Sequence, residues 1–524
     1  MKHNQVIRSV GVVGGFTLLS RGLGMLRDIF IAFHFGTSLL ASAFFVAFTI
    51  PNLFRRLFGE GALSAAFIPV FIETRTKQGD KAAWDMAAKV ATLTAAFLTL
   101  IALIGVLLFS VGIGLPDCTE KWQVTFELAR IMFPYVLLIC MAALSMAVLN
   151  SYQHFATSAF APSLLNLILI VVMLAVFPLV GQDPASRATV LAWGVLLAGA
   201  AQVAIQLPAL KRFGCPFRCS CQWNDPRVRQ MLLLMGPAAL GMAVTQFNVL
   251  IDRLLAMWIG PWAPAALFYS ERMIYFPLGI IATAMGTVLL PTFSAHAAKG
   301  ENDAMGATIT SSLRHLAFIM TPAAVGLLVL APNILGAIFE WGGSFGADST
   351  RLSARALMFY APGLVVFSAA KVFVPAFYAL QDTKTPVRIG VYTVVLNLTL
   401  NIVFILTLPE YWKHAGMALS TVAAEAMGMT ALGFLLSRKI ERIQWEAIAG
   451  SFVRYLACAL MMGAAAWAVA RYSEPLLGTL LPAKFAQLSA VALAVAAGGT
   501  AYLLLAIALK APELREIKSA IRKK

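Results

Sequence analysis

Long runs of apolar residues, each close to the length of a membrane-spanning helix, recur along the whole chain. A helix needs roughly 20 mostly apolar residues to cross a bilayer. The pattern therefore predicts an all-α polytopic membrane protein with about 14 transmembrane helices. The candidate segments are residues 9–34, 39–71, 86–114, 127–150, 159–180, 188–210, 229–259, 264–295, 311–338, 352–379, 386–408, 415–437, 451–471 and 484–510.

Basic residues in the connecting loops alternate with these segments and give the chain an orientation. With the N-terminus in the cytoplasm, about 24 Lys and Arg fall on the cytoplasmic side and about eight on the opposite side. This bias is what the positive-inside rule expects for an even number of spans, so both termini are predicted to be cytoplasmic. It also accounts for the net charge of +16 without nucleic acid as a partner.

Composition agrees with a chain surrounded mostly by lipid. Hydrophobic residues make up 60% and charged residues only 12%, whereas soluble domains carry about twice that charge. Too little polar surface remains to cover a soluble globule of this length.

Two short motifs recur at a spacing of about 222 to 228 residues, which indicates an internal repeat. Ala66-Phe-Ile-Pro-Val-Phe71 is similar to Val288-Leu-Leu-Pro-Thr-Phe293, and Tyr152-Gln-His154 parallels Leu380-Gln-Asp382. We expect two six-helix lobes related by pseudo-symmetry around a central cavity, followed by two C-terminal helices. The predicted boundaries are residues 1–212, 213–440, and 441–524 with its basic cytoplasmic tail.

Charged residues inside the apolar segments are the strongest functional signal. Each Arg at a helix centre costs roughly 2.5–3.5 kcal/mol on insertion scales, so such residues should face protein or water. The embedded basic residues are Arg21, Arg27, Arg55, Arg56, Arg253, Arg272 and Lys371, and their acidic neighbours are Asp28, Glu60, Asp252 and Glu271. The excess of positive charge favours an anionic substrate, and the planar guanidinium suits phosphate in particular.

Simpler interpretations exist for several of these residues. Arg55 and Arg56 could be interfacial anchors, and Lys371 could also be interfacial. Arg253 follows Asp252 directly and could form a structural ion pair with it. Cys215, Cys219 and Cys221 form the one cysteine cluster, but no His lies nearby to complete a metal site. No Walker motif or nucleophile elbow occurs, so an enzyme is not expected.

The first two segments resemble the MurJ (MviN) family of lipid II flippases, within the multidrug/oligosaccharidyl-lipid/polysaccharide exporter superfamily. The resemblance rests on Ser20-Arg21-x-Leu23-Gly24-x-x-Arg27-Asp28, Ala43-Phe-Phe-Val-Ala-Phe48, Ile50-Pro-Asn-Leu53, Arg55-Arg56-Leu-Phe58 and Glu60-Gly61-Ala62. Supporting stretches are Phe160-Ala-Pro-Ser-Leu-Leu-Asn166, Gly286-Thr-Val-Leu-Leu-Pro291 and Gln381-Asp-Thr-Lys-Thr-Pro386.

The resemblance implies a multi-pass protein of the bacterial inner membrane that moves lipid II for peptidoglycan synthesis. It places the family's cavity arginines at Arg21, Arg27, Arg55 and Arg272, which would hold the substrate's diphosphate, with Asp28, Arg56, Glu60 and Glu271 in support. It also implies a lipid-tail groove along the last two helices. The cell-wall synthesis machinery would be a partner.

The same resemblance suggests a sodium site at Asp252 and Asp382, although Tyr378 stands where an amide ligand is expected. Ser42 replaces an Asp that commonly precedes the Ala-Phe-Phe run, and Glu271 replaces an Asp before the cavity arginine. No other cofactor is expected. Transport would be driven by sodium or protons, by the membrane potential or by downstream use of the product.

Other functions fit parts of this pattern. A flippase for another polyprenyl-diphosphate glycan, such as an O-antigen or capsule unit, would use the same arginines. A cation-coupled drug exporter is disfavoured by the excess of Arg. A membrane glycosyltransferase or polymerase would need paired carboxylates and a large extramembrane loop, and a scaffold would leave the embedded charge without a role.

Overall fold

The computed structural model consists of helices joined by short turns, without a strand among the residues it describes. Its internal contacts divide the chain into two units, Met1–Pro264 and Ala265–Lys524. The described residues are 3–57, 63–216, 218–220, 222, 224–440, 442–514 and 516.

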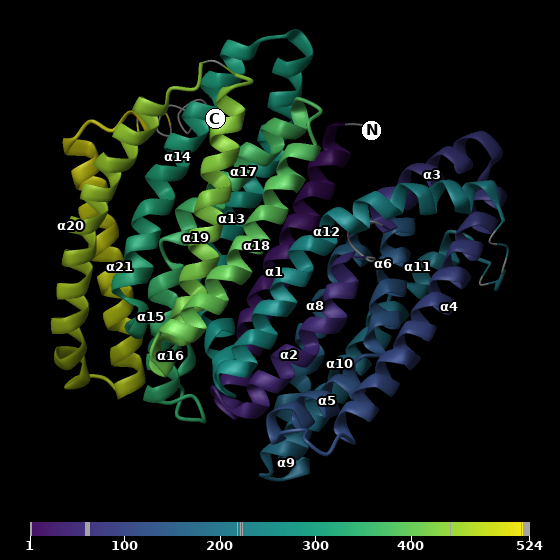
Figure 1. Cartoon of the computed structure of the whole chain (residues 1–524), viewed down its shortest axis with the longest axis horizontal. Helices are drawn as coiled ribbons and strands as arrows, with labels where there is room; N and C mark the ends of the chain where they lie inside the picture. Colours follow the sequence, from purple (N-terminus) through teal and green to yellow (C-terminus); the bar gives the residue numbers. More distant parts are fainter. Residues whose placement is uncertain are drawn as a thin grey trace. The chain divides into compact units, whose positions relative to one another are not determined.

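The first unit contains a set of long helices interspersed with short ones (Figure 1). Its elements are α1 (His3–Phe35), α2 (Leu39–Phe54), α3 (Leu63–Gln78), α4 (Asp80–Ile113), α5 (Glu120–Met132), α6 (Tyr135–Ser151), α7 (Phe155–Phe160), α8 (Ser163–Val171), the π-helix η2 (Val172–Val176), α9 (Phe177–Val180), α10 (Pro184–Ala204), α11 (Leu207–Arg212) and α12 (Pro226–Ile259).

The second unit begins within the first turn of α13 and ends with a helical pair, α20 and α21, which run side by side next to α14 (Figure 1). Its elements are α13 (Ala263–Lys299), α14 (Asn302–Val329), α15 (Ala331–Phe339), α16 (Ala347–Tyr360), α17 (Gly363–Ala379), α18 (Lys384–Thr407), α19 (Glu410–Ser437), α20 (Trp445–Gly478) and α21 (Ala483–Ala508).

Helix is present in all fourteen segments that the apolar pattern selected, which confirms the all-α membrane fold. By length and composition, nine of the described helices could each cross a membrane, or eleven spans result if each of two bent pairs is one span. Helices α1, α2, α3 and α13 are not among them, and α2 and α3 are only 16 residues long each. The count of fourteen therefore stays a prediction.

The division of the chain by packing differs from the division predicted by the repeat. Helix α12 packs on α2, α3 and α4, so it groups with the first unit, whose boundary lies at Pro264 and not at residue 212. The predicted second lobe and separate C-terminal pair both fall largely within the second unit. The lobe boundaries from the repeat remain a prediction.

Two bends at equivalent places support the internal repeat. Helices α5 and α6 meet at an angle of 41° around Pro134, and α16 and α17 meet at 45° around Pro362. Proline lacks the N–H that would continue the helix, so each bend occurs where the sequence removes a hydrogen bond. The two prolines are separated by the same spacing as the repeated motifs.

The repeated glutamines also adopt the same unusual backbone conformation. Gln153 has φ 62° and Gln381 has φ 57°, a left-handed conformation that ends α6 and α17 in the same way. In both turns the residue after the glutamine donates its N–H back into the helix. These bonds are His154 to Leu149 and Asp382 to Phe377, each 2.9 Å. The repeated sequence motif therefore corresponds to the same type of turn at both places.

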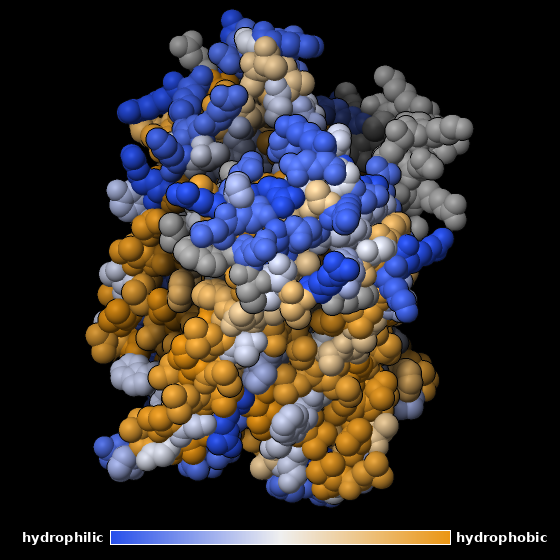
Figure 2. Space-filling view, turned by 90° about the vertical axis from the view of Figure 1, so that its right-hand side faces the viewer, coloured by the Kyte–Doolittle hydropathy of each residue, from blue (hydrophilic) through white to orange (hydrophobic). Residues whose placement is uncertain are grey.

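One face of the first unit shows how the molecule meets lipid. Along α4, large apolar side chains point away from the protein; they are Phe97, Leu100, Leu103, Leu107 and Leu108. Figure 2 shows this side of the molecule, with hydrophobic side chains in a broad band and hydrophilic ones gathered at one end. An apolar band of this kind suits a hydrocarbon environment, where exposed leucine has no cost.

Candidate functional site

Arg27 lies buried in α1 and pairs with its neighbour in the sequence. Its Nε and Nη2 atoms both donate to Asp28 Oδ1, at 2.9 and 2.6 Å. Both residues are buried, with Asp28 completely enclosed. The guanidinium is therefore held in place. The carboxylate balances its charge, which lowers the free-energy cost of burying it in an apolar segment.

Arg21 lies two turns earlier in α1 and is exposed. Close to it, Asn166 of α8 donates from Nδ2 to the Ser20 carbonyl oxygen at 3.0 Å. The side chain of Asn166 also lies against Gly24, because glycine has no side chain and leaves room for it. This contact gives a structural reason for the Asn166 motif found in the sequence, since it fixes α1 beside α8.

Arg55 and Arg56 follow directly on α2, shortly after Pro51. Arg55 Nε donates to Asn52 Oδ1 at 2.8 Å, and Arg56 Nη1 donates to Gln246 Oε1 of α12 at 3.2 Å. Arg55 is half-buried and Arg56 is exposed. Glu60, the partner expected for Arg56, lies outside the described residues.

Arg272 belongs to the second unit, in α13. Its guanidinium carbon lies 4.9 Å from the centre of the Phe268 ring, a cation–π contact that orients it. Beside it, Glu271 accepts a hydrogen bond from the hydroxyl of Tyr360 at 3.2 Å. A neighbour therefore holds each of these arginines in position: Asp28 holds Arg27, and Phe268 holds Arg272.

The four predicted arginines are therefore divided between the units. Arg21, Arg27 and Arg55 lie on α1 and at the end of α2, which pack against each other in the first unit, and Arg272 lies in the second. Ser42, at the position of the family's Asp, is fully buried in α2.

The two residues of the suggested sodium site have other surroundings. Asp382 Oδ2 accepts from Lys439 Nζ and from the Thr385 hydroxyl, both at 2.7 Å, and Oδ1 accepts from the Thr385 N–H. The Lys439 ammonium, followed by Thr385, lowers the pKa of Asp382 to about 2. The ion pair with Lys439 occupies one oxygen that a sodium ion would need, and the sodium site at Asp252 and Asp382 stays a prediction.

Asp252 is half-buried in α12 of the first unit, and the neighbouring Arg253 donates from Nη1 to the Pro264 carbonyl oxygen at 3.4 Å. Within the described part of the chain, no group of three or more His, Cys, Asp or Glu could hold a metal ion. Cys215 is half-buried and Cys219 is exposed, and Cys221 lies outside the described residues.

Sequence reasoning missed an ion cluster that ties the start of α12 to α4. Lys89 Nζ lies 2.7 Å from Asp85 and 2.9 Å from Asp225, and Arg227 Nη2 lies 2.7 Å from Asp225. The side chains of Lys89 and Asp225 are almost completely buried. The hydrogen bond from Arg227 and then that from Lys89 keep the pKa of the Asp225 carboxyl far below its usual range. The position of Lys89 within an apolar run was the feature of the sequence that could have indicated this cluster.

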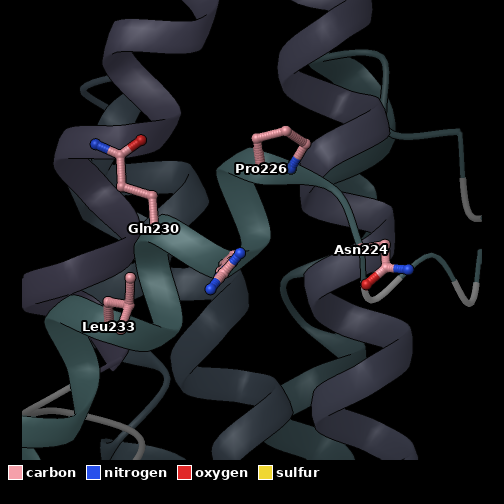
Figure 3. Close-up of a pocket in the computed structure, with 5 residues that line it drawn as sticks. Asn224, Pro226, Gln230 and Leu233 are labelled. Atoms are coloured by element: carbon pink, nitrogen blue, oxygen red, sulfur yellow. The ribbon is translucent and has the colours of Figure 1, made fainter.

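A pocket of about 460 Å³ lies at the start of α12 (Figure 3). Asn224 lines it from the preceding loop, and Pro226, Gln230 and Leu233 line it from successive turns of the helix. Arg229 is the charged residue among the described residues that line it. The pocket contains none of the predicted site residues, and one arginine at a helix start does not by itself make an anion site.

Two solved structures share the fold of this chain. A lipid II flippase MurJ structure in an inward closed conformation matches with a TM-score of 0.76 at 21% identity, over 95% of this chain and 98% of that one. An inward-facing multidrug resistance MATE family transporter of the MOP superfamily matches with a TM-score of 0.61 at 15% identity, over 80% and 94%. The fold is that of a polytopic membrane transporter.

Sequence comparison then gives the family. The family model described as "Lipid II flippase MurJ" matches residues 31–509. A probable lipid II flippase MurJ of Vibrio cholerae is 34% identical over 440 residues, covering 82% of each chain. A lipid II flippase MurJ of Burkholderia cenocepacia is 34% identical over 427 residues, covering 79% of this chain and 80% of its own. The chain belongs to the MurJ family of lipid II flippases. Arg55 and Arg272 fall within the range that the model matches, and Arg21 and Arg27 precede it.

Proposed function

We propose that this protein translocates lipid II, the undecaprenyl-diphosphate-linked disaccharide-pentapeptide, from the inner to the outer leaflet of the bacterial cytoplasmic membrane. The observation that carries the proposal is the 34% identity to a probable lipid II flippase over 82% of both chains. The protein acts as a transporter and not as an enzyme, with both termini in the cytoplasm and with peptidoglycan synthesis as the consumer of its product.

The chemistry of the substrate matches the embedded arginines. A diphosphate carries two adjacent negative charges, and each guanidinium can donate two hydrogen bonds to it at once. Arg27 and Arg272 are held in position before the substrate arrives, by Asp28 and by Phe268 respectively. A preset donor loses less side-chain entropy on binding than a free one, so these two should contribute most to capture.

Helix breaks supply the flexibility that alternating access requires. Pro51 lies inside α2 and Pro277 lies inside α13, and each removes one backbone hydrogen bond from a helix that carries or adjoins the arginines. Bending at such breaks would let the two units alternate between inward-open and outward-open states. The polyprenyl tail would stay in lipid along α20 and α21 while the head group crosses.

Depletion of the protein in its own cell tests this function. Lipid-linked intermediates would be quantified after rescue with wild type, Arg27→Ala, Arg272→Ala or Arg351→Ala. Arg351 forms an exposed pair with Asp348 and serves as a matched control, because exposed pairs contribute little.

We expect the lipid-linked peptidoglycan precursor to accumulate and to be cleared by wild type and by Arg351→Ala, but not by the other two variants. Accumulation of a different polyprenyl-linked glycan would change the substrate while keeping the anion-binding mechanism. Full rescue by Arg27→Ala and Arg272→Ala would contradict that mechanism.

A further inference from the structure

A cluster of exposed cations lies at one end of the helix pair α18 and α19 in the second unit. Lys384 and Arg388 lie in the first two turns of α18, and Arg438 directly follows the last residue of α19, all three exposed. These two helix ends meet, because Lys439 Nζ donates to Asp382 Oδ2 at 2.7 Å. This ion pair is neutral, so the charge of the cluster is that of the other three cations.

The three cations keep their positive charge. Among the described residues, Lys384 and Arg388 form no ion pair. The guanidinium carbon of Arg438 lies 4.5 Å from the centre of the Phe434 ring, a contact that brings no negative charge with it. The cluster can therefore attract an anion.

Helix geometry places Arg388 and Arg438 on the same side of the pair. The turn at residues 408–409 joins the two helices, which pack side by side and run antiparallel (Figure 1). Gly428 lies against the side chain of Thr393, and this contact marks the line between the two axes. At about 100° per residue, Arg388 lies roughly 140° from that line around α18 and Arg438 roughly 80° around α19. Because the helices run in opposite directions, both rotations lead to one side.

Exposed apolar and aromatic side chains continue from these cations along the same side. They lie one to three turns further into the two spans and are Tyr392, Val395, Met427 and Phe434. In a membrane such a face is covered by lipid, and at the level of the cations the covering group is a lipid head group. Cations at the end of an exposed apolar face are complementary to a phosphate that carries acyl chains.

We propose that this side of the α18–α19 pair binds an anionic glycerophospholipid of the cytoplasmic leaflet. Arg388 and Arg438 hold the phosphate, Lys384 adds positive charge, and an acyl chain lies along Tyr392 and Phe434. A zwitterionic lipid binds less well, because its own ammonium group is repelled by the cluster. The bound lipid is not the transported one, so the inference goes beyond the proposed function and can fail or succeed independently of it.

Lipid binding to the detergent-solubilised full chain tests the proposal. Native mass spectrometry would give the apparent Kd for phosphatidylglycerol and for phosphatidylcholine with the same acyl chains. The variants are Arg388→Gln/Arg438→Gln and the charge-conserving Arg388→Lys/Arg438→Lys. The matched control is Lys211→Gln/Arg212→Gln, which removes two exposed cations from the end of α11 in the first unit.

We expect the wild type to bind phosphatidylglycerol about ten-fold more tightly than phosphatidylcholine, the scale of one charge-assisted hydrogen bond. Arg388→Gln/Arg438→Gln should bind the two lipids equally, whereas the control and the charge-conserving variant should keep the preference. Phosphatidylglycerol with a photoreactive acyl chain should label residues 391–395 and 427–434.

Four results would overturn the inference. Equal binding of both lipids by the wild type would remove the need for a site, and loss of the preference in Lys211→Gln/Arg212→Gln would indicate a general effect of charge. Displacement of phosphatidylglycerol by inorganic diphosphate would indicate an anion site that needs no lipid. Displacement by undecaprenyl diphosphate at lower concentration would assign this surface to the transported lipid.

Discussion

At the scale of single residues, buried and partly buried charges of this protein form ion pairs with specific neighbours. Arg27 has Asp28, Lys89 has Asp85 and Asp225, and Asp382 has Lys439. The sequence shows which charges are costly, because the cost follows from their place in an apolar run. The distant partners are found only in the folded chain.

Removing Lys89 should destabilise the first unit strongly. In Lys89→Met the buried Asp225 loses one of its two cationic partners, and breaking a buried ion pair costs about 3–5 kcal/mol. We expect a clear drop in the thermal unfolding temperature of the detergent-solubilised protein. Lys77→Met is the control, since Lys77 and Glu73 form an exposed pair on α3 and its loss should change little.

The Asp382–Lys439 pair should give a pH-dependent contribution to stability. Because the pKa of Asp382 is lowered to about 2, its stabilising effect is complete above its usual pKa of about 4 and is lost as pH falls through about 2. Asp382→Asn should unfold at a lower temperature at pH 7, and the difference from wild type should shrink on acidification. Asp117→Asn, a change at an exposed loop residue, should show no such difference.

At the scale of helices, glycines decide how closely neighbours approach. A Cβ at Gly105 of α4 would come within 1.9 Å of the Phe133 ring, which lies at the bend before Pro134. The bend and the glycine therefore depend on each other: the bend places the ring, and the missing side chain gives it room.

Gly105→Ala should accordingly disturb the contact of α4 with α5. Overpacking of this kind costs typically about 1–3 kcal/mol, and we expect a lower unfolding temperature. Gly390→Ala makes a suitable comparison, because nothing lies within 4 Å of a Cβ at that position of α18. The higher helix propensity of alanine should leave that variant as stable as wild type or slightly more stable.

At the scale of the whole molecule, the orientation in the membrane follows from loop charge and can be tested with native cysteines. The loop that carries Cys219 is predicted to be cytoplasmic, and the loop that carries Cys118 is predicted to lie on the opposite side. Cys219 is exposed, and Cys118 is partly exposed.

Variants that retain one of these cysteines should react differently with a membrane-impermeant maleimide. We expect Cys118 to be labelled in cells with a permeable outer envelope and Cys219 only in inside-out vesicles. The reverse pattern would invert the proposed topology, and labelling of both from one side would contradict the number of spans between them.

The sequence by itself determined the properties that depend on the order and spacing of residues along the chain. Apolar length located the helices, and the charge within them selected seven basic residues, from which the family resemblance took Arg21, Arg27, Arg55 and Arg272. The spacing of similar motifs predicted a repeat, and the turns at Gln153 and Gln381 share the same left-handed conformation, as a repeat would require. These features follow from local composition, so they needed no knowledge of distant contacts.

Only the tertiary structure decided which side chains meet. Lys89 and Asp225 are separated by 136 residues and Lys439 and Asp382 by 57, and no pattern along the chain pairs them. A hydrophobic pattern determines that a helix lies in lipid. Which of its faces pack against other helices depends on side-chain fit and close backbone approach, and these exist only in the folded structure.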